Sequence, residues 1–554
     1  MSSSSPPAGG HTKAIDTPPV VTGGVSRLAP WALVVLCVLI PFGVIVNVAL
    51  HSITTFDGGL NFQVAYHIAH GAGYSRDYGG RIYSPAEVET SGYFLILASI
   101  GFKLFGLNNV SLALPNLLFM ILLLAGASFA LRRRPVLRLL APVVLILLTP
   151  RVAEFGLDGF GEFVSASLSL WCFILITEVI EGTRKPYLMA SLAWLIMGIG
   201  LTIKVVSVAT VPVALAGFTF ALLLHPELRR PRFGLTSLWM FLPVAIWEIY
   251  RYIEVKSADR WVAYWRTQLS GISDRAATND AHEGIWHKGL DHLHLLRAAT
   301  GLDAVPLVLI LLAPLIGLFA ALVSARRLLP QWLGESGHSL AVQLGAFVAL
   351  YEIWWLFLTP TRQAWLRRFE IGWISLVLLT LLLFGMLWDE VRDRLGTAFT
   401  IRRWRFVAPT AIAALIVVTV CLPGAWSLAK NNLKSYKASD AEQTEEAGAS
   451  TEAARLAASG ATLCGSGWWA APVVSLTAKV PFCNLVALPT EIACSPPMRQ
   501  SFDSGRVYLV WDRYAAGLVS PTPPRSARFI FTPAPSPTPY ASFWTISLQP
   551  STCR

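Results

Sequence analysis

Apolar runs of about twenty residues recur along the chain and alternate with short polar or charged stretches. An α-helix needs about 20 apolar residues to cross a bilayer core, and fewer when it is tilted or buried in protein. The pattern therefore predicts an α-helical polytopic membrane protein with about 11 transmembrane helices. The predicted spans are 29–50, 110–131, 136–150, 160–180, 187–203, 205–225, 233–250, 304–324, 340–359, 369–388 and 406–426.

Basic clusters fall in every second turn between these runs, and they predict the orientation. Short cytoplasmic loops carry an excess of Lys and Arg. The clusters are 132–134, 184–185, 229–230, 326–327 and 392–405. The N-terminus is then cytoplasmic, and the loops 51–109 and 251–303 are extracytoplasmic. Counting 92–106 as another span would invert every later loop, so we expect a helix lying in the outer interface there.

The composition agrees with this interpretation. The 554 residues are 54% hydrophobic and only 14% charged, whereas a soluble domain has about 25% charged residues. The net charge of +11 is explained by the basic loops and predicts no nucleic-acid partner. Residues 1–28, rich in Ser, Pro and Gly, are expected to be a disordered cytoplasmic N-terminus, followed by a transmembrane domain at 29–426.

The C-terminal part, 427–554, has a different pattern. A polar helix is expected near 440–458, followed by short strand-like runs, which predicts a small α/β domain outside the membrane. Cysteines 464, 483, 494 and 553 lie in this part. Four cysteines favour two disulfides and an oxidising, periplasmic compartment, and their pairing has three alternatives.

Asp57 follows the first apolar run and begins an amphipathic stretch. An Asp at this place can cap the helix. It can also act as a general base that takes a proton from an acceptor hydroxyl.

Further candidate residues lie in the other external turns. Glu154, Asp158 and Glu162 have helical spacing, so they could assist catalysis, bind an acceptor or a divalent cation, or form a solvated end of a span. Of these, Asp158 and Glu162 are our catalytic candidates. Lys204 interrupts an apolar run, where it could contact a lipid phosphate or an acidic partner, or simply extend to the interface.

Three arginines precede a late span on the predicted outer side, against the positive-inside bias. Arg362, Arg367 and Arg368 are therefore predicted to bind phosphate, with anionic lipid headgroups as the alternative. In the 251–303 loop, His287, Asp291 and His294 have helical spacing that a metal could use. We prefer a loop that covers the acceptor groove.

Residues 56–74, beginning Phe56-Asp57-Gly58-Gly59, resemble the first external loop of GT-C membrane glycosyltransferases, a superfamily that includes the protein O-mannosyltransferases and the aminoarabinose transferases. The resemblance continues through 90–93 and 102–109. Two departures are Gly58, where the family often has Glu, and Glu89-Thr90, where the aminoarabinose transferases have Lys-Pro.

The resemblance implies an inverting glycosyltransferase in the plasma (inner) membrane, with Asp57 as the base. Its donor would be a polyprenyl-phosphate hexose or pentose, and its acceptor a cell-envelope glycan, lipid or protein. Tyr74, Tyr83 and His287 are assigned to the acceptor groove. No cofactor is required, although a divalent cation is compatible with the acidic residues. A lipid flippase and a non-catalytic glycolipid-binding relative are the alternatives.

Overall fold

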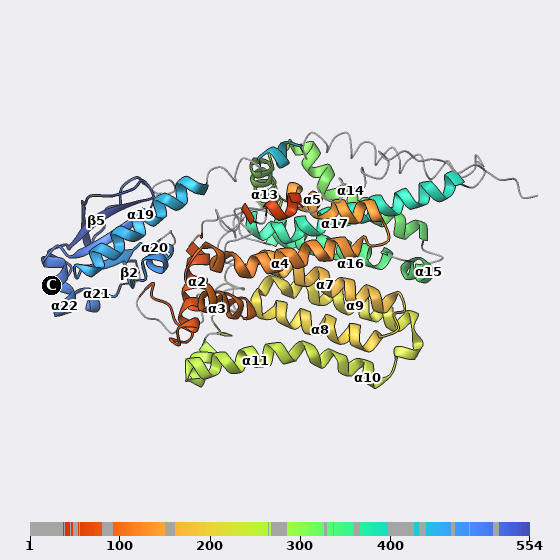
Figure 1. Cartoon of the computed structure of the whole chain (residues 1–554), viewed down its shortest axis with the longest axis horizontal. Helices are drawn as coiled ribbons and strands as arrows, with labels where there is room; N and C mark the ends of the chain where they lie inside the picture. Colours follow the sequence, from red (N-terminus) through yellow and green to blue (C-terminus); the bar gives the residue numbers. More distant parts are fainter. Residues whose placement is uncertain are drawn as a thin grey trace, which may run out of the picture.

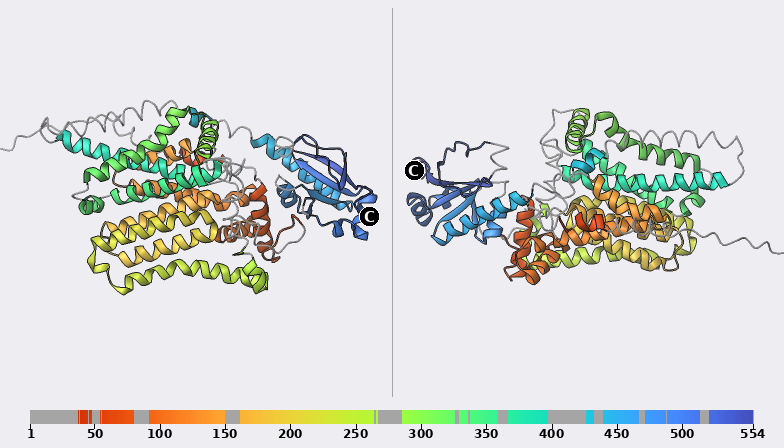
Figure 2. Two further views of the ribbon diagram at one scale, coloured as in Figure 1. Left: turned by 180° about the vertical axis from the view of Figure 1, so that it is seen from behind. Right: turned by 45° about the horizontal axis from the view of Figure 1, so that its top comes forward.

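In the computed structural model, the described residues are 37, 39–44, 46–47, 54, 56–79, 92–149, 161–263, 265–266, 285–325, 329–335, 337–358, 366–396, 426–431, 439–466, 471–486, 488–512 and 520–553. Long apolar helices run side by side in one bundle, and a smaller domain with a β-sheet lies beyond one end of that bundle (Figure 1). The same arrangement is visible from two further directions (Figure 2). The predicted class, a helical membrane protein with a C-terminal α/β domain, is confirmed.

Eight helical segments of the described residues are long and apolar enough to cross a membrane. They are built on α4 (Asn109–Ala130), α7 (Glu162–Ile180), α8 (Pro186–Ile203), α9 (Thr210–Leu224) with η2 (Val205–Ala209), α11 (Leu238–Val255) with α10 (Pro231–Gly234) and η4 (Leu235–Ser237), α14 (Ala304–Ala325), α16 (His338–Ile353) with η5 (Trp354–Leu358), and α17 (Leu366–Gly396). The predicted span at 136–150 is the shorter helix α5 (Pro135–Leu148). The predicted span at 29–50 is described only in part, and the one at 406–426 lies outside the described residues.

Local sequence explains where several of these helices begin. Asn108 and Ser111 form a reciprocal capping box at the start of α4, which satisfies free backbone N–H groups. Pro135 and Pro186 stand in the first turns of α5 and α8, where a missing N–H costs nothing. Gly198 allows α8 to approach α11, because a Cβ there would lie 2.2 Å from the Met240 carbonyl oxygen. Small residues allow such close contact between membrane helices.

The predicted interfacial helix is α3 (Tyr93–Phe105), which has 13 residues. At 1.5 Å per residue it is about 20 Å long, shorter than the ~30 Å bilayer core. Together with α2 (Phe56–Ala69), it lies at the end of the bundle next to the C-terminal domain (Figure 1). It exposes Ile100, Leu104 and Phe105, which are side chains suited to lipid contact.

The opposite end of the bundle carries paired basic residues. Arg134 Nε donates to Asp389 at 2.7 Å, and Arg132 pairs with Glu178. A backbone N–H at Gly337 donates to Glu181 at 2.9 Å. The pKa of Glu181 is raised, and burial is the largest cause. Basic residues at the end remote from the C-terminal domain are what the predicted topology requires, and the side of the membrane on which they lie stays a prediction.

The C-terminal domain contains a five-stranded sheet of order β2-β1-β3-β5-β4. Its strands are β1 (Thr462–Gly465), β2 (Phe482–Asn484), β3 (Val507–Asp512), β4 (Phe529–Pro533) and β5 (Ala541–Leu548). The pairs β1–β2 and β1–β3 are parallel, and β3–β5 and β4–β5 are antiparallel. The helices are α19 (Ser439–Ala458), α20 (Ala471–Ala478), α21 (Thr490–Ala493) and α22 (Pro496–Asp503).

The two predicted disulfides are confirmed, and the structure gives their pairing. Cys464–Cys483 joins the neighbouring strands β1 and β2. Cys494–Cys553 joins the end of α21 to the last residues of the described chain.

The remaining short helices are η3 (Pro226–Leu228), α13 (Ile285–Thr300) and α15 (Leu329–Gly334). Helix α13 lies within the predicted external loop 251–303, whereas the part of that loop at 267–284 is outside the described residues.

Candidate active site between the bundle and the C-terminal domain

Helix α2 lies between the bundle and the C-terminal domain, and Asp57 is in its first turn. The Asp57 side chain is buried, at 8% exposure. Gly59 follows closely, and a Cβ there would lie 2.9 Å from Cγ2 of Val473 in α20. Helix α2 therefore contacts the C-terminal domain near the turn that carries the candidate base.

The other side of α2 packs on the bundle. Phe62, Val64 and Ala65 belong to one buried cluster with Val164 of α7 and Ile203 of α8. Val164 is close in sequence to Glu162, and Ile203 directly precedes Lys204. The contacts of α2 therefore place it over the ends of the two helices that carry those candidate residues.

Glu162 and Lys204 form a buried ion pair. Lys204 Nζ lies 3.1 Å from Glu162 Oε1, and the two side chains are 10% and 2% exposed. Helix α7 begins at Glu162, where an acidic side chain interacts well with the positive end of the helix dipole. Helix α8 ends at Ile203 and Lys204 is extended, so the predicted turn at this lysine is confirmed.

Hydroxyl pairs hold the Lys204 turn against α7. Ser165 Oγ lies 2.6 Å from Ser207 Oγ, and Ser169 Oγ lies 2.8 Å from Thr210 Oγ1. Both pairs are buried, so they are favourable only when each hydroxyl has its partner. They fix the register between α7 and the η2–α9 segment that follows the lysine.

Further buried polar groups surround this pair. The Tyr351 hydroxyl donates to the carbonyl of Arg368, and Glu162, Arg368 and Glu370 interact electrostatically with Tyr351. Tyr351 and Glu370 are 1% and 2% exposed. Arg368 was among the residues predicted from the sequence, whereas Tyr351 and Glu370 were not. An acidic residue inside a predicted span was the available signal for Glu370.

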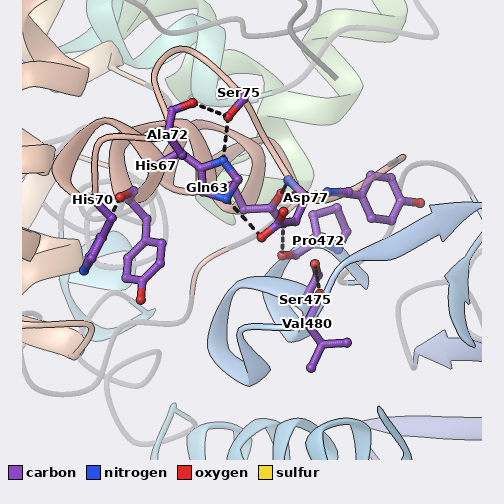
Figure 3. Close-up of polar contacts among 11 residues, drawn as sticks. Gln63, His67, His70, Ala72, Ser75, Asp77, Pro472, Ser475 and Val480 are labelled. Carbon is purple, nitrogen blue, oxygen red and sulfur yellow. Dashed lines mark hydrogen bonds and ion pairs between the residues drawn. The ribbon is translucent and has the colours of Figure 1, made fainter. Parts of the chain in front are cut away.

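The loop after α2 is closely packed (Figure 3). His67 lies between Ser75 Oγ, 2.7 Å from its Nδ1, and Asp77 Oδ2, 3.0 Å from its Nε2. Burial lowers the pKa of Arg76 to about 10, an effect that Tyr78 partly opposes. The loop therefore holds its polar side chains in internal contacts.

Two residues assigned to the acceptor groove have contrasting surroundings. Tyr74 is buried beside Trp247 of α11, at a ring distance of 6.0 Å, and its backbone N–H donates to Glu254 at 3.2 Å. His287 is exposed on α13, and its Nε2 lies 3.8 Å from Asp291. The acceptor-groove role of both stays a prediction. Among the described residues, no group of three or more His, Cys, Asp or Glu side chains could hold a metal.

Other predicted site residues cannot be placed. Tyr83, Glu154, Asp158 and Arg362 lie outside the described residues, as does the side chain of Arg367. Of the predicted catalytic and phosphate-binding residues, the structure brings Glu162 and Lys204 together in a buried pair at the helix ends that α2 covers, and Arg368 is half-buried with its backbone carbonyl bound to Tyr351.

No protein-family profile matches this chain, and a search of curated proteins finds no significant relative. Solved structures do resemble it. The structure of ArnT from Cupriavidus metallidurans bound to undecaprenyl phosphate has 13% sequence identity and a TM-score of 0.56, over 95% of this chain and 99% of that chain.

Two archaeal structures are also similar. The oligosaccharyltransferase AglB from Archaeoglobus fulgidus, in complex with an inhibitory peptide and a dolichol-phosphate, has 12% identity and a TM-score of 0.50, over 96% of this chain and 75% of that chain. A complex of the Archaeoglobus fulgidus oligosaccharyltransferase with Zn and sulfate has 13% identity and a TM-score of 0.50, over 87% and 68% of the two chains. ArnT and AglB are GT-C proteins. The chain therefore has the fold of the GT-C glycosyltransferases.

Proposed function

We propose that the protein is an integral membrane glycosyltransferase that moves a sugar from a polyprenyl-phosphate donor to a lipid, glycan or protein acceptor on the extracytoplasmic face. The observation that carries the proposal is the buried Glu162–Lys204 pair beneath the helix of Asp57. Ionisable groups at the end of a membrane bundle are costly to bury and are usually functional. The lipid phosphates bound by ArnT and AglB in the similar structures support a lipid-linked donor.

In this mechanism Asp57 accepts the proton of the acceptor as its heteroatom attacks the anomeric carbon of the donor. The new glycosidic bond forms while the bond from that carbon to the phosphate oxygen breaks, and polyprenyl phosphate leaves with both bonding electrons. Direct displacement inverts the anomeric carbon. A buried carboxylate is a suitable base because few waters compete for the proton.

The departing phosphate gains negative charge, which needs cations held in place before the reaction. Lys204 and Arg368 supply this stabilisation in our proposal, together with Arg362 and Arg367. Glu162 holds the Lys204 ammonium at 3.1 Å, so the lysine does not have to be ordered at the moment of reaction. Asp158 joins Glu162 as an acidic residue of the site.

The acceptor is proposed to lie between the first external loop and α13, beside Tyr74, Tyr83 and His287. The AglB complex with a peptide is compatible with a protein acceptor, and glycans and lipids remain in the proposed class. The chemistry needs no cofactor. A divalent cation is a secondary proposal, which the zinc in one AglB complex and the acidic residues favour.

The test uses purified protein in nanodiscs with a panel of polyprenyl-phosphate sugars, and measures the polyprenyl phosphate released. Asp57→Asn should lower turnover by about 10²–10⁴-fold, the usual contribution of a general base. The matched control is Glu227→Gln, because the Glu227 side chain is 66% exposed and lies in η3, which follows the end of α9 remote from Lys204. Near-normal turnover in Asp57→Asn would remove the base assignment.

A further inference from the structure

One buried glutamine joins three separate parts of the chain (Figure 3). Gln63 Nε2 donates to the carbonyl of Pro472 at 2.7 Å. Its Oε1 accepts from the backbone N–H groups of Asp77 at 3.1 Å and Tyr78 at 2.9 Å. A single side-chain amide thus links helix α2, the loop that follows it and helix α20 of the C-terminal domain.

The contacts of Gln63 are buried and specific to an amide. The side chain is 1% exposed, so a lost partner would leave a polar group without water to replace it. The amide offers an N–H donor and a separate carbonyl acceptor at the same end of the side chain. A carboxylate would keep the acceptor for the two loop N–H groups but would place negative charge against the Pro472 carbonyl.

The loop held by Gln63 also extends the sheet of the C-terminal domain. Tyr78 forms a parallel bridge to Phe482 of the edge strand β2, and the Gly79 N–H donates to the Phe482 carbonyl at 2.8 Å. Gly465 of β1 makes room for Tyr78, because a Cβ there would lie 2.8 Å from Tyr78 Cε2. The edge of the sheet is thereby paired with the loop.

Helix α2 needs these contacts to keep a fixed direction. It has 14 residues, and isolated helices of about this length are marginal in water. Gln63 lies about 9 Å along the axis from Asp57, at 1.5 Å per residue. The orientation of the candidate base therefore depends on what holds both sides of the helix, the bundle on one and the C-terminal domain on the other.

We propose that Gln63 is a positioning residue, which fixes α2 and Asp57 to the C-terminal domain and makes that domain part of the catalytic unit. The inference rests on the proposed glycosyltransferase function for its effect on turnover. The link itself is independent of that function. Loss of Gln63 misplaces the base without removing any group that touches the donor phosphate.

The experiment compares Gln63→Leu and Gln63→Glu with a matched control, Gln343→Leu. Gln343 is also buried, at 4% exposure, and its Nε2 donates to Thr177 Oγ1 at 3.0 Å, at a helix contact away from Asp57. For each variant we would measure kcat, the Kd for a polyprenyl-phosphate donor and hydrogen exchange at the amides of Asp77, Tyr78 and Gly79.

Gln63→Leu should lower kcat by roughly ten- to hundredfold, the usual cost of misplacing a reacting group by about 1 Å. The donor Kd should stay within about twofold, since no phosphate contact is removed. The three loop amides should exchange faster. Gln63→Glu should be intermediate in kcat, and the exchange rate of the Asp77 and Tyr78 amides should stay nearer to that of the unaltered protein.

The outcomes separate the two proposals. An unchanged kcat in Gln63→Leu, or an equal loss in Gln343→Leu, would overturn the positioning role. If the unaltered protein transfers no sugar from any donor, the proposed function fails, and the exchange data then decide whether Gln63 holds the loop. Unchanged exchange at the three amides would show that it does not.

Discussion

Replacing Lys204 with methionine separates the structural role of the buried ion pair from its proposed role in donor binding. Methionine has nearly the length of lysine but carries no charge. The change leaves the Glu162 carboxylate, 2% exposed and 3.1 Å from the lysine nitrogen, without its ammonium partner. Glu162→Gln with Lys204→Met removes both charges together.

The expected magnitudes differ between the single and the double variant. Removing one member of a buried pair costs about 3–5 kcal/mol, because the remaining charge is desolvated and uncompensated. Replacing both members is often close to neutral. The single variant should therefore lower the free energy of unfolding by about 3 kcal/mol or more, roughly a hundredfold in the folding equilibrium, and the double variant should recover most of it.

Donor binding should behave differently, because the lost ammonium is not restored in the double variant. We expect both variants to bind polyprenyl phosphate at least about tenfold more weakly, as expected from loss of a charge-assisted hydrogen bond. Unfolding in detergent micelles gives the stability, and titration of labelled polyprenyl phosphate gives the affinity. A double variant as unstable as the single one would refute the ion-pair reasoning, and unchanged affinity in both would refute the phosphate role of Lys204.

Two further changes test the contact between α2 and the C-terminal domain. Gly59→Ala should lower sugar transfer several-fold, because the new Cβ would lie 2.9 Å from Val473 Cγ2. The control Gly317→Ala should leave transfer unchanged, because its new Cβ would have no atom within 4 Å. Equal transfer rates in the two variants would contradict this. Replacing both cysteines of the Cys464–Cys483 bridge with serine should lower transfer more than removing Cys494–Cys553, since only the first bridge holds the strand that pairs with the loop after α2. Thermal unfolding should give the opposite order. The Cys464–Cys483 bridge spans 19 residues and the Cys494–Cys553 bridge spans 59, so removing the second bridge should cost about 1 kcal/mol more stability through chain entropy.

Features encoded by neighbouring residues were predictable from the sequence. The polar run at 440–458 became α19, and the short strand-like runs expected after it became strands of the C-terminal sheet. The break at Lys204 was also visible, because a charge in an apolar run is hard to continue through a span. Each of these predictions depended on patterns within about twenty residues.

Contacts between distant segments could not be predicted in the same way. The predicted topology placed Glu162 and Lys204 on the same side of two consecutive spans, and an acidic partner was one expectation for Lys204, but the sequence did not identify Glu162 as that partner. Tyr351 was passed over because a tyrosine in an apolar run is typical of a helix packing position. Only the packing of α16 on α7 and α17 reveals that its hydroxyl faces charged neighbours.

Helix α2 shows what an amphipathic pattern leaves open. The pattern separates apolar residues from polar ones that include Asn61, Gln63 and His67, but it does not say what the polar residues contact. In the structure all three are buried, at 1%, 1% and 5% exposure, as is the apolar residue Phe62. A helix covered on both sides must give each polar group a partner, so its polar residues report contacts with a second domain. The partner of Gln63 in that domain, Pro472, lies 409 positions further along the chain. The polar residues of a short helix at the end of a membrane bundle can therefore mark a contact with a domain outside the bundle. In this chain α2 is such a contact, and its polar residues do not form a surface in water.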